Sequence, residues 1–231
     1  MIISGAAGAA VTKRLTDLGA KVVCLEVPKP ASKPAVPLAG AAVCVAGVIA
    51  GAELVVAAAA FQDRYAPDEF PMDLWRRIIR VNLEGSFNAN RVFASRMARA
   101  GRGSIVNVAS INGRSSSPQH AYGPTKAAMI NMTKNFAAQY GKSGVRVNSV
   151  SPGAVLVPRV LARKPGRYAT DIDGQMALGR RIQPVEIAEG IEFLLSDRAS
   201  AITGIDLMID AGWDVANSWH IYGGVPGPVA G

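Results

Sequence analysis

Strand-length apolar runs alternate with long helical patterns in the second half of this chain, and this alternation restricts the possible folds most. Residues 104–109 form such a run, a helical pattern follows over about 121–140, and residues 145–150 form the next run. A longer helical pattern, over 72–100, precedes them. Alternating strands and helices predict a parallel sheet with helices on both faces. We therefore expect a doubly wound α/β fold.

The N-terminal part of the chain follows this alternation less closely. Residues 1–5 predict a strand, a helical pattern ends at Gly19, and residues 21–26 predict a buried strand that ends in Glu26. The runs 41–45 and 54–60 predict two further strands, yet the interval between them is too short for a helix with its turns. The expected sheet is therefore shortened between its second and fourth strands.

Length and composition favour one globular domain. The chain has 231 residues, of which 18% are charged, which predicts a single domain over 1–231 with a C-terminal extension over 214–231. Cys24 and Cys44 lie in apolar runs, which predicts free thiols in a reducing compartment rather than a disulfide framework. The start of the chain lacks the basic and apolar segments of a secretory signal. We expect a cytoplasmic protein.

Membrane and nucleic-acid partners are not expected. The uncharged stretch over 34–52 contains two prolines and consists mostly of alanine and glycine, which favours buried sheet rather than a membrane span. The net charge is +8, but the arginines are scattered through helical patterns without aromatic interleaving. This distribution predicts a solvated basic surface.

One basic cluster differs from the rest because its residues fall close together in a predicted loop: Arg159, Arg163, Lys164 and Arg167. Clustered arginines bind phosphates or carboxylates, so Arg159 and Arg163 are candidates for holding an acyl-CoA or a dicarboxylate substrate. The alternative is a solvated loop whose charges keep the surface soluble.

Three polar residues at a strand end and a helix start, together with Asn82 in the preceding helix, predict proton-transfer chemistry. Ser110 follows the strand over 104–109, and Tyr122 and Lys126 lie one helical turn apart at the start of the next helix. A lysine ammonium near a phenol lowers the phenol's pKa, so the tyrosine can exchange a proton with an alcohol oxygen at neutral pH. Ser110 lies where open α/β sheets place ligands and would hold that oxygen. Each residue also has an ordinary structural interpretation, such as a helix kink at Asn82.

With Asn82 and the segment 148–153, these residues resemble the short-chain dehydrogenase/reductase family from about Phe70 to Trp213. The resemblance implies a Rossmann-like fold, oxidation of a small-molecule alcohol with NAD, and a water held by Asn82 that relays protons through Lys126. It also implies assembly as a dimer or tetramer through the helices that contain Asn82 and Tyr122. Their apolar candidates for facing a partner are Phe87, Val92, Phe93, Met129 and Met132. No metal site is expected.

The nucleotide-binding features of that family are incomplete in this chain. The expected turn, Gly-x-x-x-Gly-x-Gly, is shortened here, with Gly5 as its first glycine and Gly8 as its last. The alanines 57–60 stand where the family carries Asn-Asn-Ala-Gly, and Val157 stands where it carries a threonine. Glu26 keeps the acidic position that would bind the adenosine ribose, although a surface acid is an equal alternative.

Three hypotheses follow from this contrast. In the first, the chain is a structural or regulatory subunit of an NAD-dependent alcohol dehydrogenase, and a related subunit binds the NAD. The pattern also resembles one half of the heteromeric hydroxybenzylsuccinyl-CoA dehydrogenases. In the second, the chain is a self-sufficient dehydrogenase with a shortened nucleotide loop. In the third, the chain is a non-enzymatic binding protein on the same fold.

Overall fold

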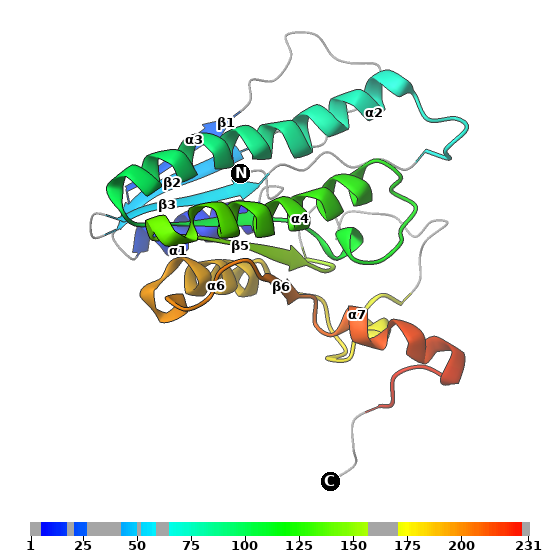
Figure 1. The fold of residues 1–231 in the computed structure, drawn as a ribbon. Helices are drawn as coiled ribbons and strands as arrows, with labels where there is room; N and C mark the ends of the chain where they lie inside the picture. Colours follow the sequence, from blue (N-terminus) through cyan, green and yellow to red (C-terminus); the bar gives the residue numbers. More distant parts are fainter. Residues whose placement is uncertain are drawn as a thin grey trace.

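A computed structural model describes residues 6–17, 21–26, 43–49, 52–58, 65–156 and 171–227, and its centre is one six-stranded sheet (Figure 1). The strands lie side by side in chain order, from β1 to β6. Their bounds are β1 Lys21–Glu26, β2 Val43–Ile49, β3 Ala52–Ala58, β4 Gly103–Val108, β5 Val145–Pro152 and β6 Asp206–Ile209. The predicted strand over 1–5 lies outside the described residues.

The sheet is parallel from β3 to β6, but β2 runs antiparallel to both of its neighbours. The predicted parallel sheet is confirmed from β3 to β6, and β2, in the region predicted to be shortened, departs from it. The register places Ile49 opposite Ala52, so only a hairpin connects β2 to β3. Parallel neighbours need a crossover of a dozen or more residues, whereas a short link reverses the strand. The shortening expected between the second and fourth strands thus changes the direction of a strand.

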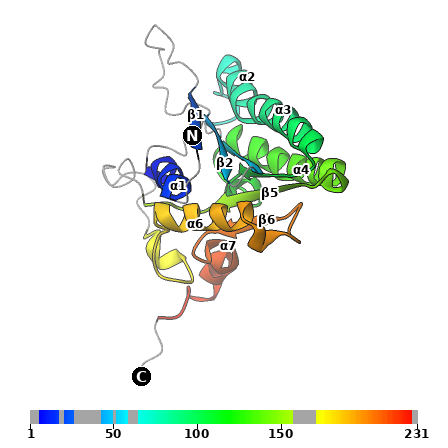
Figure 2. The ribbon, with the colours of Figure 1, turned by 90° about the vertical axis from the view of Figure 1, so that its left-hand side faces the viewer.

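Helices cover both faces of the sheet, as predicted for a Rossmann-like α/β fold (Figures 1 and 2). On one face lie α4 (Tyr122–Tyr140) and a continuous helix made of α2 (Met72–Ile79), the π-helical turn η1 (Arg80–Glu84) and α3 (Gly85–Ala100). On the other face lie α1 (Ala6–Asp17) and α6 (Pro184–Leu195), which contact each other. No described helix is long and apolar enough to cross a bilayer.

Two apolar layers hold the helices to the sheet, and β4 contributes to both. Val106 and Val108 pack with α6, whereas Ile105 packs on the opposite face with Met97 and Met129. All five side chains are almost fully buried, and burying each stabilises the fold by about 1.5–3 kcal/mol. A strand buried on both faces reads as a continuous apolar run, which is the pattern that predicted β4.

The predicted partner-facing residues differ in burial, and Phe93 is partly buried against the core of the chain. Phe87 and Val92 are exposed on α3. Met129 and Met132 are buried in the chain's own core, so their predicted place on an assembly surface was wrong. Helical periodicity locates an apolar face but does not say whether that face meets the sheet or another molecule.

The C-terminal residues extend away from the sheet, in red in Figure 1. They form α7 (Trp213–Ala216) and the turn η6 (Asn217–Tyr222). Val215, Ile221 and Tyr222 are among the most exposed apolar side chains of the described residues. The C-terminal extension over 214–231 stays a prediction, and this segment falls largely within it.

Candidate active site

Ser110 lies at the carboxyl end of β4, where the chain leaves the sheet. Its backbone is extended, and the 3-10 turn η2 (Ile111–Gly113) begins directly after it. The backbone N–H of Asn112 donates to Ser110 Oγ at 3.2 Å. This contact caps the turn and sets the direction of the serine hydroxyl. Only 8% of Ser110 is exposed, so the hydroxyl lies in a largely desolvated site.

Tyr122 and Lys126 lie on one face of α4, one turn apart, and both are buried. Lys126 Nζ is 5.5 Å from the centre of the Tyr122 ring. The same ammonium donates to the carbonyl oxygen of Val108 at 2.7 Å, which ties the helix to the end of β4. The structure therefore brings together the tyrosine, the lysine and the strand that leads into Ser110.

Burial has a large effect on Lys126. Desolvation lowers the pKa of its ammonium from 10.5 to about 7. A lysine that titrates near neutral pH can both donate and accept protons there. A buried lysine is rare outside functional sites, because its charge loses hydration.

Asn82 lies within the π-helical turn η1 and is fully buried against α4. Its side-chain Nδ2 donates to Thr125 Oγ1 at 3.2 Å, and its backbone carbonyl oxygen accepts from Ser86 Oγ at 2.8 Å. Thr125 directly precedes Lys126, so Asn82 is brought to the proton-transfer residues. Single π-turns often occur at functional sites, and here the predicted kink and the predicted site coincide at one residue.

Two glycines allow the Ser110 turn to pack closely on α4. A Cβ at Gly113 would lie 2.7 Å from the backbone nitrogen of Ala127 and 2.7 Å from the carbonyl carbon of Lys126. A Cβ at Gly123 would lie 2.9 Å from the carbonyl oxygen of Asn112. The absence of side chains at both positions lets the serine approach Tyr122 and Lys126.

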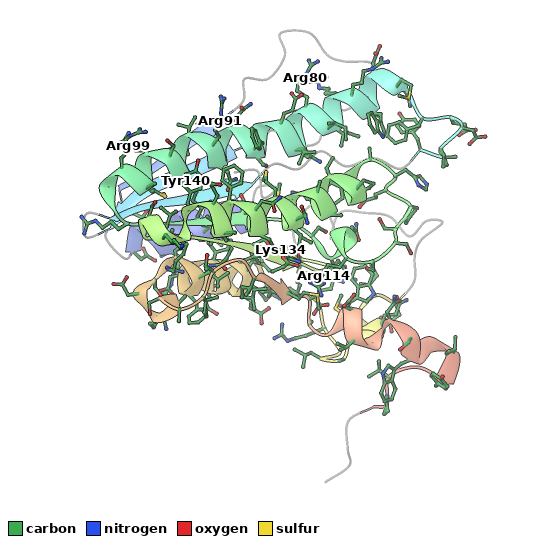
Figure 3. The ribbon with its side chains drawn as sticks, viewed as in Figure 1. Arg80, Arg91, Arg99, Arg114, Lys134 and Tyr140 are labelled. Carbon is green, nitrogen blue, oxygen red and sulfur yellow. The ribbon has the colours of Figure 1, made fainter. Side chains whose placement is uncertain are left out.

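An ion pair that the sequence did not predict also holds this turn. Arg114, labelled in Figure 3, follows η2. Its guanidinium donates to the buried carboxylate of Asp206 at 3.2 Å. Ser149 Oγ and Ser151 Oγ donate to the same carboxylate at 2.7–2.9 Å. The two serines lie two positions apart in β5, so they are on the same face of the strand, and this spacing was the available signal. Their partner on β6 is far away in sequence.

The nucleotide side is less complete in the described residues. Gly8 lies in the first turn of α1, where a glycine permits close packing of helix and sheet, and Glu26 is the last residue of β1. Ala57 and Ala58 end β3, with Ala57 opposite Asn107, and offer no polar side chain there. Gly5, Val157, Arg159 and Arg163 lie outside the described residues. Of the predicted nucleotide-binding positions, the structure thus describes the backbone at Gly8, Glu26, Ala57 and Ala58.

Metal ligands do not gather in the part of the chain that the structure describes: no group of three or more His, Cys, Asp or Glu side chains has suitable geometry. Ser110, Tyr122 and Lys126, the residues predicted to transfer protons, lie close together in the fold. A hydroxyl, a phenol and an amine are groups that can exchange protons with an alcohol oxygen.

Comparison with known proteins identifies the class of protein. A family model described as enoyl-(acyl carrier protein) reductase matches residues 41–214. A 3-alpha-(or 20-beta)-hydroxysteroid dehydrogenase from Mycobacterium bovis is 34% identical over 219 residues, which are 94% of this chain and 80% of that protein. The chain belongs to the short-chain dehydrogenase/reductase family, whose members similar to this chain are oxidoreductases that act on CH–OH groups.

Solved structures agree on the fold. A gluconate 5-dehydrogenase from Burkholderia cenocepacia, in complex with NADP and tartrate, has a TM-score of 0.66 and 28% identity, covering 71% of this chain and 65% of that one. A ribose-5-phosphate isomerase from Brucella melitensis has a TM-score of 0.70 and 40% identity, covering 75% and 69%. One fold thus carries different named activities, and the side chains of the site must decide the function.

Proposed function

We propose that this chain acts in an NAD-dependent oxidoreductase that interconverts secondary alcohols and ketones, with Tyr122 as the proton-transfer residue. The observation that carries the proposal is the buried Lys126, whose Nζ lies 5.5 Å from the Tyr122 ring and whose pKa falls to about 7. Buried lysines with this partner fit proton transfer at neutral pH better than structural support.

Each residue has a separate role in the proposed reaction. In the oxidation direction the Ser110 hydroxyl holds the substrate oxygen, and the Tyr122 phenolate accepts the hydroxyl proton. Lys126 in its charged form stabilises the phenolate. Asn82, which contacts the neighbouring Thr125, would hold the water through which Lys126 passes the proton onward. Bound NAD would supply the hydride acceptor. Reduction of a ketone uses the same residues in reverse, with Tyr122 as the acid.

The test compares the wild-type chain with Tyr122→Phe for NAD-dependent oxidation of a panel of secondary alcohols. The assays use the chain alone and the chain mixed with a related dehydrogenase subunit that has an intact glycine turn. We expect the variant to lose about 10²- to 10⁴-fold in turnover, the usual contribution of a general acid-base group, with an unchanged melting temperature. Equal turnover in the two proteins would overturn the assignment of Tyr122.

We further propose that this chain binds NAD poorly and depends on a related subunit for it. The β2–β3 hairpin and the alanines at the end of β3 support this, because they replace a crossover and polar side chains on the nucleotide side. The competing hypothesis is a self-sufficient enzyme. Calorimetric titration of the purified chain with NAD separates them: we expect binding weaker than about millimolar, or none, and low-micromolar binding would support the self-sufficient enzyme.

The proposed assembly uses the surface of α3. Phe87 and Val92 are exposed there, and the Phe87 ring packs edge-to-face on Phe136 of α4 at 5.7 Å. A second copy or a related subunit would cover them. Light scattering of Phe87→Glu/Val92→Glu should show a smaller particle than the wild type, whereas Val185→Glu, at an exposed valine of α6, should not change the size. A wild-type monomer that binds no related dehydrogenase would contradict the assembly.

For substrate, we propose a hydroxyacyl-CoA ester held by Arg159 and Arg163. The support is the sequence cluster, because both residues lie outside the described part of the chain. Replacing both by alanine in the assembled enzyme should raise the Michaelis constant for a CoA ester and flatten its dependence on ionic strength, with a smaller change in turnover at saturation. Unchanged kinetics would leave this loop as ordinary surface.

A further inference from the structure

Gln119 is a second polar residue in the segment that joins Ser110 to Tyr122. It lies three residues before Tyr122, and only 8% of it is exposed. Its backbone carbonyl accepts from the N–H of Gly123 at 3.0 Å, so its position is fixed by the start of α4. A buried amide so close to the proton-transfer residues needs hydrogen-bond partners for both its oxygen and its nitrogen.

The oxygen of this amide is satisfied from the serine side of the site. Asn112 Nδ2 donates to Gln119 Oε1, and the backbone N–H of the same Asn112 donates to Ser110 Oγ at 3.2 Å. One residue therefore connects the Gln119 amide with the Ser110 hydroxyl. With Oε1 engaged in this way, the amide must present Nε2 in another direction, because the two atoms lie at opposite corners of the planar group.

The nitrogen makes no hydrogen bond with the residues that the structure describes. It is also not sealed inside the protein, because Ser117 Oγ is the only fully enclosed side-chain polar atom without a partner among those residues. Nε2 therefore remains reachable from outside. A ligand whose acceptor replaces water at this largely buried donor binds more tightly. A ligand that leaves the donor unpaired binds more weakly.

We infer that Gln119 determines specificity by donating from Nε2 to a second oxygen of the substrate, near the carbinol that Ser110 holds. The acceptor is a neutral oxygen, such as a hydroxyl, a ketone or a thioester carbonyl. An amide carries no charge to balance a carboxylate, and the nearby Arg114 is already paired with Asp206. The preferred substrates are thus secondary alcohols with a second oxygen function, rather than simple apolar alcohols. The inference rests on the proposed alcohol site.

The test compares two alcohols that differ by one hydroxyl, cyclohexanol and cyclohexane-1,2-diol, using both the cis and the trans diol. Their affinities for the full chain are measured by ligand-observed NMR, which does not require turnover. The main variant is Gln119→Glu, assayed at pH 8, because it retains an oxygen for Asn112 and loses the donor. Gln119→Leu is the second variant, and Gln139→Leu, at an exposed position of α4, is the matched control.

For the diol isomer that the wild type binds more tightly, we take the ratio of its affinity to that of cyclohexanol. We expect each Gln119 variant to lower this ratio by about fivefold to tenfold, which is the contribution of one neutral hydrogen bond. The control should leave the ratio unchanged. An unchanged ratio in both folded variants would overturn the inference. Oxidation assays with the same alcohols separate it from the proposed function. If the chain oxidises these alcohols but the affinity ratio is unchanged in the variants, the role of Gln119 is refuted and the proposed function stands. If the ratio shifts but no assembly oxidises the alcohols, the proposed function is refuted and the role of Gln119 in binding stands.

Discussion

The region around β4, β5 and α4 and the region around β1, β2 and β3 meet in one sheet but differ in what they retain. The first carries Ser110, Tyr122 and Lys126 at the carboxyl end of parallel strands. The second joins β2 to β3 by a hairpin and ends β3 in alanines. Because β2 is antiparallel to both neighbours, β1 and β3 remain parallel to β4. Their carboxyl ends therefore lie at the same edge of the sheet as Ser110. The hairpin between β2 and β3 therefore leaves β4 and β5 parallel, with Ser110 at the carboxyl end of β4.

The largest effect should follow Lys126→Met, which removes the buried ammonium charge from the region around β4, β5 and α4. We expect turnover to fall by about 10²- to 10⁴-fold, because the Tyr122 phenolate loses its stabilising charge. A variant with near wild-type turnover in the active assembly would show that Lys126 is only a packing residue.

The same variant should change how stability depends on pH. Lys126 has a pKa of about 7 in the folded chain and 10.5 when unfolded, so between these values the unfolded state binds the extra proton. Wild-type stability should rise from pH 7 toward pH 10, by at most about 1.4 kcal/mol per pH unit from this group, relative to Lys126→Met. Urea unfolding at several pH values measures this difference. Parallel curves for the two proteins would contradict the buried charge.

Gly113→Ala should have the next largest effect, because the site region depends on close packing between the Ser110 turn and α4. The added methyl group would meet backbone atoms at 2.7 Å, which we expect to cost about 1–3 kcal/mol of unfolding free energy and to lower turnover. Gly141→Ala is the matched control, since no atom lies within 4 Å of its Cβ and its φ is −57°. Thermal unfolding of both variants decides the point. Equal losses would show that the close approach at Gly113 is not required.

Asp206→Asn should have a smaller effect. It keeps the shape of the side chain but removes the charge that holds Arg114, and half-exposed ion pairs contribute about 1 kcal/mol at most. We expect kcat/KM to fall by about threefold to fivefold, with little change in melting temperature. Arg198→Met, which breaks the ion pair with Glu192 on α6, is the control for loss of an unrelated pair. A similar kinetic loss in the control would remove the link between Arg114 and the serine turn.

Native-state hydrogen exchange compares the two regions without any substitution and should show the smallest difference. β4 has strand neighbours on both sides and apolar layers on both faces, whereas β1 pairs, among the described strands, with β2 alone. We expect the amides of β4 to open only on global unfolding, and those of β1 to exchange at lower free energies. Equal protection in both strands would show that the hairpin region is as firmly held as the site region.

Much of the fold and site could be predicted because the relevant signals are local. The apolar run and the helical spacing predicted β4 and α4. Ser110, Tyr122 and Lys126 are close in sequence, so their proximity could also be predicted. The short interval before Leu54 also showed that no crossover helix could form there. The comparisons confirm the family and its alcohol chemistry. The roles of the individual site residues stay predictions.

The tertiary structure alone decided features that depend on residues distant in sequence. The direction of β2 depends on which strands it pairs with, and the pairing of Arg114 with Asp206 joins segments 92 positions apart. Met129 turned inward and Phe87 outward because the sheet lies on only one side of the helix pair. The pKa of Lys126 likewise depends on the enclosing protein, because desolvation requires atoms from several elements at once. The sequence determined that Ser110, Tyr122 and Lys126 are present as candidates for proton transfer, and the fold determined that they are buried together.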